Sequence, residues 1–307
     1  MSRPPIVAIC PGGVVTGGPE AQHQLVDMAN EISPGSGFVC YTPFGERHEV
    51  PEPYRTYDTP VIGRHEIPDD AFIVIPEIWP DLIHDFSQPC AFWWLSVDNF
   101  WDWSGDTDTV RKAAVQLVQS EYARRHLAQT LGMNALMLTD YINTSYDSTG
   151  VFKLRRVAVN PTKGAELIEE FRGRFPDIEV VELAGMSREQ VRAELASSAV
   201  YIDFGHHPGR DRLPREAAVC ETVVMTTRLG AAANPIDVPI RDWYKFDTVD
   251  ELGPKVRSVF ASFGEHLMAQ RPYLEVIRAQ RQRYRHEVER LLSVAEVTAI
   301  LTGRYRE

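Results

Sequence analysis

Apolar residues along this chain alternate between short continuous runs and longer amphipathic stretches. Short buried runs separated by segments of helix length are typical of parallel sheets built from βαβ units. In the first half, the pattern predicts helices over 19–32 and, behind a capping Ser120, up to 131. It also predicts strands over 5–10, 37–41, 72–75, 91–95, 115–119 and 135–138.

The second half repeats the pattern after segment 141–151, whose Asn, Ser, Thr and Gly residues predict a linker. Strands are expected over 155–159, 179–183, 199–204 and 222–226, with helices over 163–175, 188–197 and 213–220. Ser187 and Gln190 have the spacing of a capping box. The tail over 266–301 is expected to be helical in at least two segments, because Pro272 interrupts it.

These elements predict an α/β protein with two Rossmann-like βαβ domains facing a cleft. The expected boundaries are 1–147 for the first domain, 148–265 for the second and 266–307 for a C-terminal helical segment. A chain of 307 residues is near the size at which a single core divides into domains.

Composition narrows the class of protein further. The chain is 44% hydrophobic and 24% charged, which fits a globular protein, and no run of 18 apolar residues predicts a membrane span. The N-terminus lacks the apolar segment of a secretory signal. Four widely spaced cysteines without a Cys-x-x-Cys pair predict buried thiols in a reducing cytosol, and hence a cytoplasmic protein.

The net charge of −11 is concentrated in the first half. Residues 1–150 hold 20 acidic and 8 basic residues, whereas residues 151–307 hold 23 and 24. An acidic first domain argues against nucleic acid as a partner, because a phosphate backbone requires a basic face. The second half can still hold a small phosphorylated ligand.

Two glycine-containing turns follow predicted strands and suggest anion or polyol binding. The first contains Gly17 and Gly18; it is not a Walker A loop, because Pro19 stands where the lysine is required, and it lacks the Gly-x-Gly-x-x-Gly pattern. A flexible turn with no ligand is the alternative. In the second turn, Lys163 stands at a predicted helix start, where an ammonium group suits a diphosphate.

The segment 201–220 is the third candidate site. It predicts a strand, a loop with glycine, and a helix that begins near Leu213 and Pro214 and carries Glu216 in its first turn. Arg210 and Arg212 supply donors that fit phosphate, and a helix carboxylate can accept hydrogen bonds from ribose hydroxyls. The alternatives are a solvated rim for the arginines and a favourable helix-start acid for the glutamate.

The order of these motifs resembles GT-B glycosyltransferases of a large family-four-like group. The resemblance rests on Gly17-Gly18, on Ser120 through Gly132, on an interdomain segment at 140–143, on the Pro-x-Lys-Gly turn at 161–164 and on 213–220. The stretches 93–100 and 203–212 further resemble a bacterial subgroup associated with surface-polysaccharide synthesis.

The resemblance implies a nucleoside diphosphate sugar as donor, a glycan or glycoconjugate as acceptor, and neither metal nor cofactor. It assigns Lys163, Arg210 and Arg212 to the leaving diphosphate, Glu216 to the ribose, and Asp98 to proton acceptance. The implied donor-binding set is Gly17, Gly18, Lys163, Arg210, Arg212, Leu213, Pro214 and Glu216. The family's first glutamate falls here on Pro208, so the usual Glu-x7-Glu pair is absent.

Other functions remain as alternatives. A non-catalytic nucleotide- or glycan-binding protein would have the same fold, and a transferase acting on modified nucleic acid would conflict with the acidic first domain. A Rossmann oxidoreductase or epimerase lacks its Gly-x-Gly-x-x-Gly and Tyr-x-x-x-Lys motifs here. Asp106 and Asp108 form a literal Asp-x-Asp, but helix capping explains both acids. Adjacent His206 and His207 suggest hydrogen bonding more than metal ligation.

Overall fold

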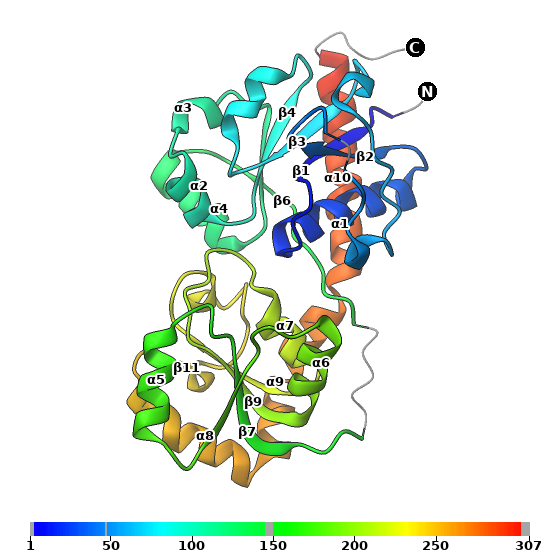
Figure 1. The fold of residues 1–307 in the computed structure, drawn as a ribbon. Helices are drawn as coiled ribbons and strands as arrows, with labels where there is room; N and C mark the ends of the chain where they lie inside the picture. Colours follow the sequence, from blue (N-terminus) through cyan, green and yellow to red (C-terminus); the bar gives the residue numbers. More distant parts are fainter. Residues whose placement is uncertain (1–2, 47, 145–149, 302–307) are drawn as a thin grey trace. The chain divides into compact units, whose positions relative to one another are not determined.

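The computed structural model describes residues 3–46, 48–144 and 150–301, and the chain divides into two compact units (Figure 1). Unit 1 comprises Met1–Tyr141 together with Arg281–Glu307, and unit 2 comprises Ile142–Gln280. The predicted linker over 141–151 contains the boundary between the units, and its residues 145–149 lie outside the described residues. The C-terminal helices divide between the two units.

Unit 1 is built on a six-stranded parallel sheet in the order β2-β1-β3-β4-β5-β6. Its strands are β1 Ile6–Pro11, β2 Gly37–Thr42, β3 Phe72–Pro76, β4 Cys90–Trp94, β5 Val115–Val118 and β6 Leu136–Met137. Its helices are α1 Gly17–Ile32, α2 Val97–Trp103, α3 Thr107–Val110, α4 Glu121–His126 with a π-helical continuation over Leu127–Leu131, and α10 Gln280–Leu301.

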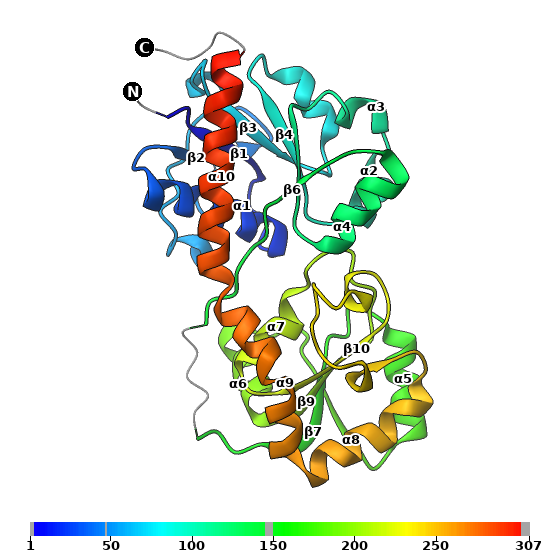
Figure 2. The same cartoon turned by 180° about the vertical axis from the view of Figure 1, so that it is seen from behind.

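Alternate residues of each central strand serve the two faces of this sheet. Phe72, Val74 and Trp93 pack with residues of α1 and α10, while Ile73 and Trp94 pack toward the side of α2, α3 and α4. Figure 2 shows α10 crossing one face of the unit 1 sheet. The strands read as continuous apolar runs because both faces are covered.

Unit 2 is a five-stranded parallel sheet in the order β11-β10-β9-β7-β8. Its strands are β7 Leu154–Val159, β8 Glu179–Glu182, β9 Ser198–Asp203, β10 Val223–Thr227 and β11 Lys245–Phe246. Its helices are α5 Ala165–Arg174, α6 Arg188–Ser197, α7 Arg212–Val219, α8 Leu252–Ala261 and α9 Phe263–Arg278. The predicted caps are confirmed, since Ser187 and Gln190 form a capping box and Ser120 accepts from Ala123 N.

Both sheets reverse their strand order once, between β1 and β3 in unit 1 and between β7 and β9 in unit 2. In open parallel sheets, ligands bind outside the carboxyl ends of the strands at such a reversal. The topology therefore predicts that the loops after β1 and β3 in unit 1, and after β7 and β9 in unit 2, are the places where a ligand would bind.

The tail is helical in two segments, α9 and α10, as expected, but two details of the predicted helices are wrong. The break does not lie at Pro272, which is inside α9; it lies at Ala279. A proline frees the carbonyl four residues earlier, and that position is Met268, whose side chain is 60% exposed; water on this face can satisfy the freed carbonyl. Helix α7 begins at Arg212, so Glu216 lies beyond the first turn, and Pro214 falls within that turn, where its missing N–H costs nothing.

Candidate functional site

The loops after β7 and β9 meet at the reversal point of the unit 2 sheet. Strand β7 pairs directly with β9, so Val159 and Asp203 end neighbouring strands at the same edge. The predicted site residues Lys163, Arg210 and Arg212 all follow these two ends.

Two glycines allow these loops to interlock. Gly164 has a φ of 69° at the N-cap of α5, and a Cβ there would lie 2.6 Å from the carbonyl oxygen of Phe204. A Cβ on Gly205 would lie 2.6 Å from the Cβ of Lys163 and 2.8 Å from its Cδ. The aliphatic part of Lys163 therefore packs against the backbone at Gly205 in the second loop, and this contact fixes the direction of the lysine side chain.

The ammonium group of Lys163 is held at the start of α7. Its Nζ donates to Oδ2 of Asp211 at 2.5 Å and to the carbonyl oxygen of His206 at 3.3 Å. The Lys163 side chain is 32% exposed and that of Asp211 is 16% exposed, so the pair is only partly screened by water. The predicted lysine thus already has an anionic partner.

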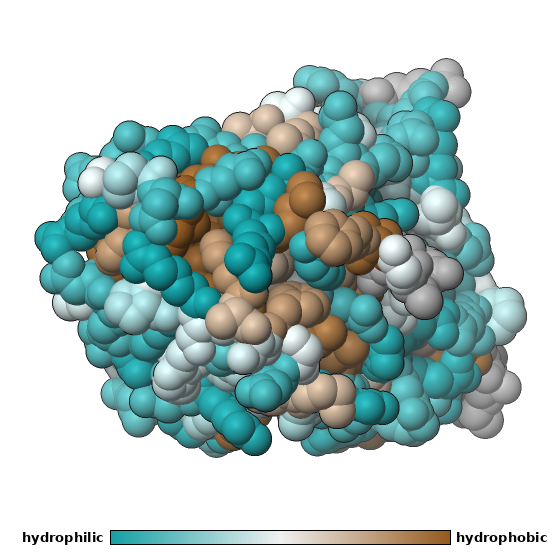
Figure 3. Space-filling view, turned by 90° about the horizontal axis from the view of Figure 1, so that it is seen from below, coloured by the Kyte–Doolittle hydropathy of each residue, from teal (hydrophilic) through white to brown (hydrophobic). Residues whose placement is uncertain are grey.

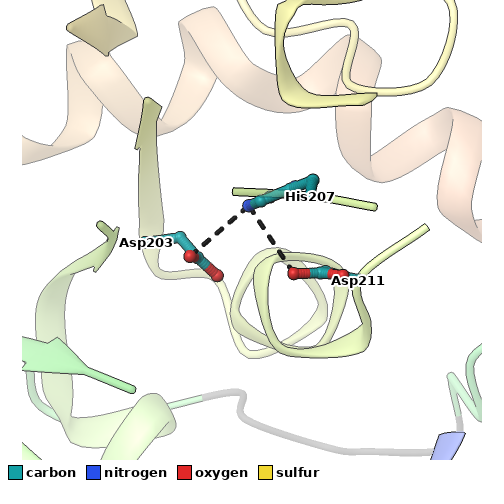
Figure 4. A group of neighbouring side chains, drawn as sticks. All are labelled: Asp203, His207 and Asp211. Atoms are coloured by element: carbon teal, nitrogen blue, oxygen red, sulfur yellow. Dashed lines mark ion pairs between the residues drawn. The ribbon is translucent and has the colours of Figure 1, made fainter. Parts of the chain in front are cut away.

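Asp211 also belongs to a group of three side chains with the buried Asp203 and His207 (Figure 4). Nε2 of His207 lies 3.4 Å from Oδ1 of Asp203 and 3.8 Å from Oδ2 of Asp211. Asp203 also accepts from the hydroxyl of Tyr201 at 2.9 Å and from the N–H of Gly205 at 3.0 Å. Burial raises the pKa of Asp203, but these hydrogen bonds and His207 outweigh it, and the pKa ends below its ordinary value.

Donor atoms of Asp203, His207 and Asp211 lie within 4.8 Å of one another, the spacing of a cation site. However, Asp203 already receives two hydrogen bonds, and Asp211 already holds the ammonium group of Lys163. A divalent cation would have to displace that lysine. The charges of the group therefore favour a lysine-neutralised cluster over a metal centre.

Arg215 is the third arginine of the 210–215 segment, which the sequence suggests as a cationic site for phosphate, but its side chain is buried and holds the loop backbone. Its side chain is 2% exposed, and its guanidinium donates to the carbonyl oxygens of Asp211 and Arg210 and to Oε1 of Gln280. A guanidinium buried in this way must have its donors satisfied. It therefore fixes the backbone that carries the site.

The remaining predicted residues of unit 2 lie on α7. Nε of Arg212 is 3.4 Å from Oε1 of Glu216, one helical turn away, and both side chains are about one-fifth exposed (18% and 22%). Pro214 is buried, and Leu213 packs partly against the core of unit 2. The six donor-site residues predicted in this unit therefore lie on two adjoining segments, 163 and 210–216.

Gly17, Gly18 and Asp98 belong to unit 1 and follow β1 and β4. Gly17 and Gly18 are the first residues of α1, and Asp98 lies in the first turn of α2. Burial raises the pKa of Tyr122, and the charge of Asp98 adds to this effect. Because α2 follows the carboxyl end of β4, Asp98 lies on the carboxyl-edge side of its own sheet.

Glu77 is a buried carboxylate that sequence reasoning missed. It follows β3, is 2% exposed, and accepts from the N–H groups of Leu95 and Ser96 at 3.1 Å each. Burial raises its pKa to about 7, although those hydrogen bonds oppose the shift. Glu77 ties the end of β3 to the start of α2, the helix that carries Asp98.

Sequence reasoning assigned no role to Asp203 or Asp211 and suggested only hydrogen bonding for His207. A usable signal existed, because an acid that ends a strand of a parallel sheet stands at the ligand-binding edge. The two later residues follow at intervals of four, but they lie in a loop, so spacing alone could not bring them together.

The other candidate motifs have structural roles. Asp106 caps α3 by accepting from the N–H groups of Asp108 and Thr109, as expected. Trp93 and Trp94 are fully buried, whereas Trp101 and Trp103 are 43% and 68% exposed.

A separate apolar pocket at the start of β7 is lined by residues that include 151–152, 260 and 263. Figure 3 shows hydrophobic side chains gathered on the face seen from below.

No family model and no curated protein matches the sequence. Solved structures do match over nearly the whole chain. A glycosyltransferase from Rickettsia africae has a TM-score of 0.65 and 11% identity, covering 97% of this chain and 99% of its own. HepE of Anabaena with UDP and glucose has a TM-score of 0.68 and 14% identity, covering 94% and 99%. The α,α-trehalose 6-phosphate synthase of Burkholderia multivorans has a TM-score of 0.59 and 11% identity, covering 99% and 100%.

These likenesses establish the fold. The chain has the GT-B fold that the order of its motifs predicted, with two parallel α/β sheets and a long C-terminal helix. Within the described residues, no helix is long and apolar enough to cross a membrane.

Proposed function

We propose that the chain is a glycosyltransferase that moves a sugar from a nucleoside diphosphate sugar to a glycan or glycoconjugate acceptor without a metal ion. The carrying observation is that Lys163 is fixed between two interlocked loops at the reversal point of the unit 2 sheet. Negative charge grows on the leaving diphosphate as the bond to the sugar breaks. A fixed cation therefore lowers the energy of the transition state more than that of the bound donor.

The other residues of the site take roles that fit this chemistry. Arg210 and Arg212 add cationic donors for the diphosphate, and Leu213 and Pro214 form the helix start that faces it. Glu216 accepts hydrogen bonds from the ribose hydroxyls, for which its partly exposed carboxylate is suited.

Unit 1 supplies the acceptor side in this proposal. Gly17 and Gly18 open the first turn to a ligand, and Asp98 accepts the proton of the attacking hydroxyl. The four cysteines are buried free thiols, which fits action in the reducing cytoplasm.

The fold neighbours suggest the first donor to try. HepE of Anabaena was determined in complex with UDP-glucose, and this chain shares its fold. A thermal-shift screen against UDP, GDP, ADP, CMP and TDP, each with and without its sugar, would identify the base, since specific binding raises the melting temperature.

The ribose assignment is tested with Glu216→Gln. The variant should fold normally and bind the selected nucleotide more weakly by roughly 1.5–3 kcal/mol, because a hydrogen bond to a charged acceptor is lost. Calorimetry measures the affinity, and Glu166→Gln, an exposed acid on α5, is the matched control. Unchanged affinity in a folded Glu216→Gln protein would remove the assignment.

The leaving-group assignment is tested with Lys163→Ala. Turnover of the donor should fall by about 10²-fold or more, because the cation acts most strongly in the transition state. Lys112→Ala, which removes an exposed lysine of unit 1, should leave turnover unchanged. A wild-type protein that binds no nucleoside diphosphate sugar and turns none over would refute the proposed function.

A further inference from the structure

One ion pair at the proposed donor site has a feature that the assignment of Lys163 to the diphosphate does not explain. Asp211 is the N-cap of α7, and a carboxylate at that position normally accepts from the N–H groups of its own first turn. Asp211 makes no such bond, and its Oδ2 instead accepts from Nζ of Lys163 at 2.5 Å.

Pro214 provides the physical reason. An N-cap side chain bonds to the N–H of the second or third helical residue, and Pro214 is the third residue of α7. Proline has no N–H, so half of the usual capping partners are missing. The sequence Asp-Arg-Leu-Pro thus leaves the Asp211 carboxylate available to the lysine.

Neighbouring residues fix the stem of Lys163 and the backbone of Asp211, while the ammonium group of Lys163 can still change partner. The stem of Lys163 is seated against Gly205, so only the ammonium group can change partner without moving the loop. The backbone of Asp211 is fixed by buried Arg215, which donates to its carbonyl oxygen at 3.1 Å. The carboxylate itself is 16% exposed, and besides Lys163 it has Nε2 of His207 as a neighbour, at 3.8 Å.

We propose that Asp211 is a resident counter-ion that occupies the diphosphate position on Lys163 when no donor is bound, and that the incoming diphosphate displaces it. This inference rests on the proposed function, since it assumes that the site takes a diphosphate. A phosphate oxygen that takes the place of Asp211 Oδ2 on Nζ of Lys163 breaks the Lys163–Asp211 pair. Asp211 therefore makes the site selective for ligands with a strongly charged diphosphate over those with a single phosphate.

The test uses inorganic pyrophosphate as the probe, because it carries the diphosphate without a base or sugar. Asp211→Asn should bind pyrophosphate about fivefold more tightly or better than wild type, since the competing anion is gone. Asp211→Ser, which also keeps a residue favoured at an N-cap, should act in the same direction. The measurement is isothermal titration calorimetry of the full chain, with the melting temperature of each variant recorded beside it.

Two controls separate displacement from a general change of charge. Asp177→Asn removes an exposed carboxylate of unit 2 that pairs with Arg257, and it should leave pyrophosphate affinity unchanged. In a Lys163→Ala background, Asp211→Asn should change affinity by less than about twofold, because the two residues act on each other.

Each outcome decides the matter. Unchanged pyrophosphate binding in Asp211→Asn and Asp211→Ser would overturn the inference. Weaker binding would also overturn it, because it would make Asp211 a group that positions the lysine. An equal gain in the Lys163→Ala background would also overturn it. A gain without turnover of any nucleoside diphosphate sugar would count against the proposed function alone, whereas turnover without a gain would overturn the counter-ion role alone.

Discussion

At the scale of single residues, the behaviour of unit 2 depends on how its charges are matched. Lys163, Asp211, His207 and Asp203 lie next to one another in that order, and each carboxylate has a cationic or hydrogen-bonding partner. Such a cluster is stable without an added ion. It also predicts how the protein responds to metals.

We expect divalent cations to be dispensable. Adding Mg²⁺, Mn²⁺ or Zn²⁺ should leave the melting temperature unchanged, and EDTA should leave nucleotide binding and turnover intact, because Lys163 already neutralises Asp211. Differential scanning calorimetry and donor turnover measure the two effects. A strict metal requirement would point to the Asp203, His207 and Asp211 group, or to Asp106.

Glu77 gives a prediction about pH. Burial raises its pKa to about 7 from an ordinary 4.5, so the folded state holds a proton that the unfolded state has released between these values. Its contribution to stability is therefore full below pH 4.5 and is lost as pH rises through 7, by up to ~3 kcal/mol. Urea unfolding of wild type and Glu77→Gln from pH 4.5 to 7.5 should show the wild type losing its relative stability along this interval. Parallel pH profiles would contradict the shift.

At the scale of elements, helix α10 completes unit 1 although it is far away in sequence. Its buried residues Tyr284, Val288 and Leu292 pack with α1 and the sheet. Glu287 fixes its position, since Oε2 accepts from both the N–H and the hydroxyl of Thr139 at 2.7 Å. These two hydrogen bonds fix the position of α10 along the sheet.

We predict that Glu287→Ala lowers the free energy of unfolding by roughly 3 kcal/mol, because two buried donors lose a charged acceptor. Glu289→Ala, which removes a partly exposed acid on the same helix, should change it by no more than about 0.5 kcal/mol. Urea denaturation compares the two variants. Equal effects would mean that the contact with Thr139 contributes nothing specific.

The helices and strands also show which elements the local pattern of apolar residues can predict. The ten predicted strands lie within two residues of their predicted positions, because continuous apolar runs must be buried on both faces of a parallel sheet. Strand β11 and helices α2 and α8 were not predicted. β11 has only two residues, Lys245–Phe246, too few to show a periodicity, and its place is set by pairing with β10.

At the scale of the whole molecule, the chain leaves unit 1, builds unit 2 and returns to unit 1 with α10. Each unit has its own apolar core, with residues 142–280 supplying all of one. This arrangement predicts that the units differ in their dependence on the C-terminus.

Removing residues 281–307 should unfold unit 1 and leave unit 2 folded. The deletion exposes the sheet face that Tyr284, Val288, Leu291 and Leu292 cover, each worth about 1.5–3 kcal/mol when buried. Calorimetry should then show a single transition, and amide exchange should show protection confined to 150–280. Persistent protection in β1 and β3 would contradict this dependence.

The sequence by itself determined the alternation of strands and helices, their caps, and the segments that carry Lys163, Arg210, Arg212 and Glu216. These follow from local rules, since periodicity and capping act over one or two helical turns. Only the tertiary structure decided which partner each of these charges has. Asp211 reaches Lys163 across 48 positions, and α10 returns to a sheet built more than 140 residues earlier, because such pairings depend on strand order and on loops that interlock through glycines.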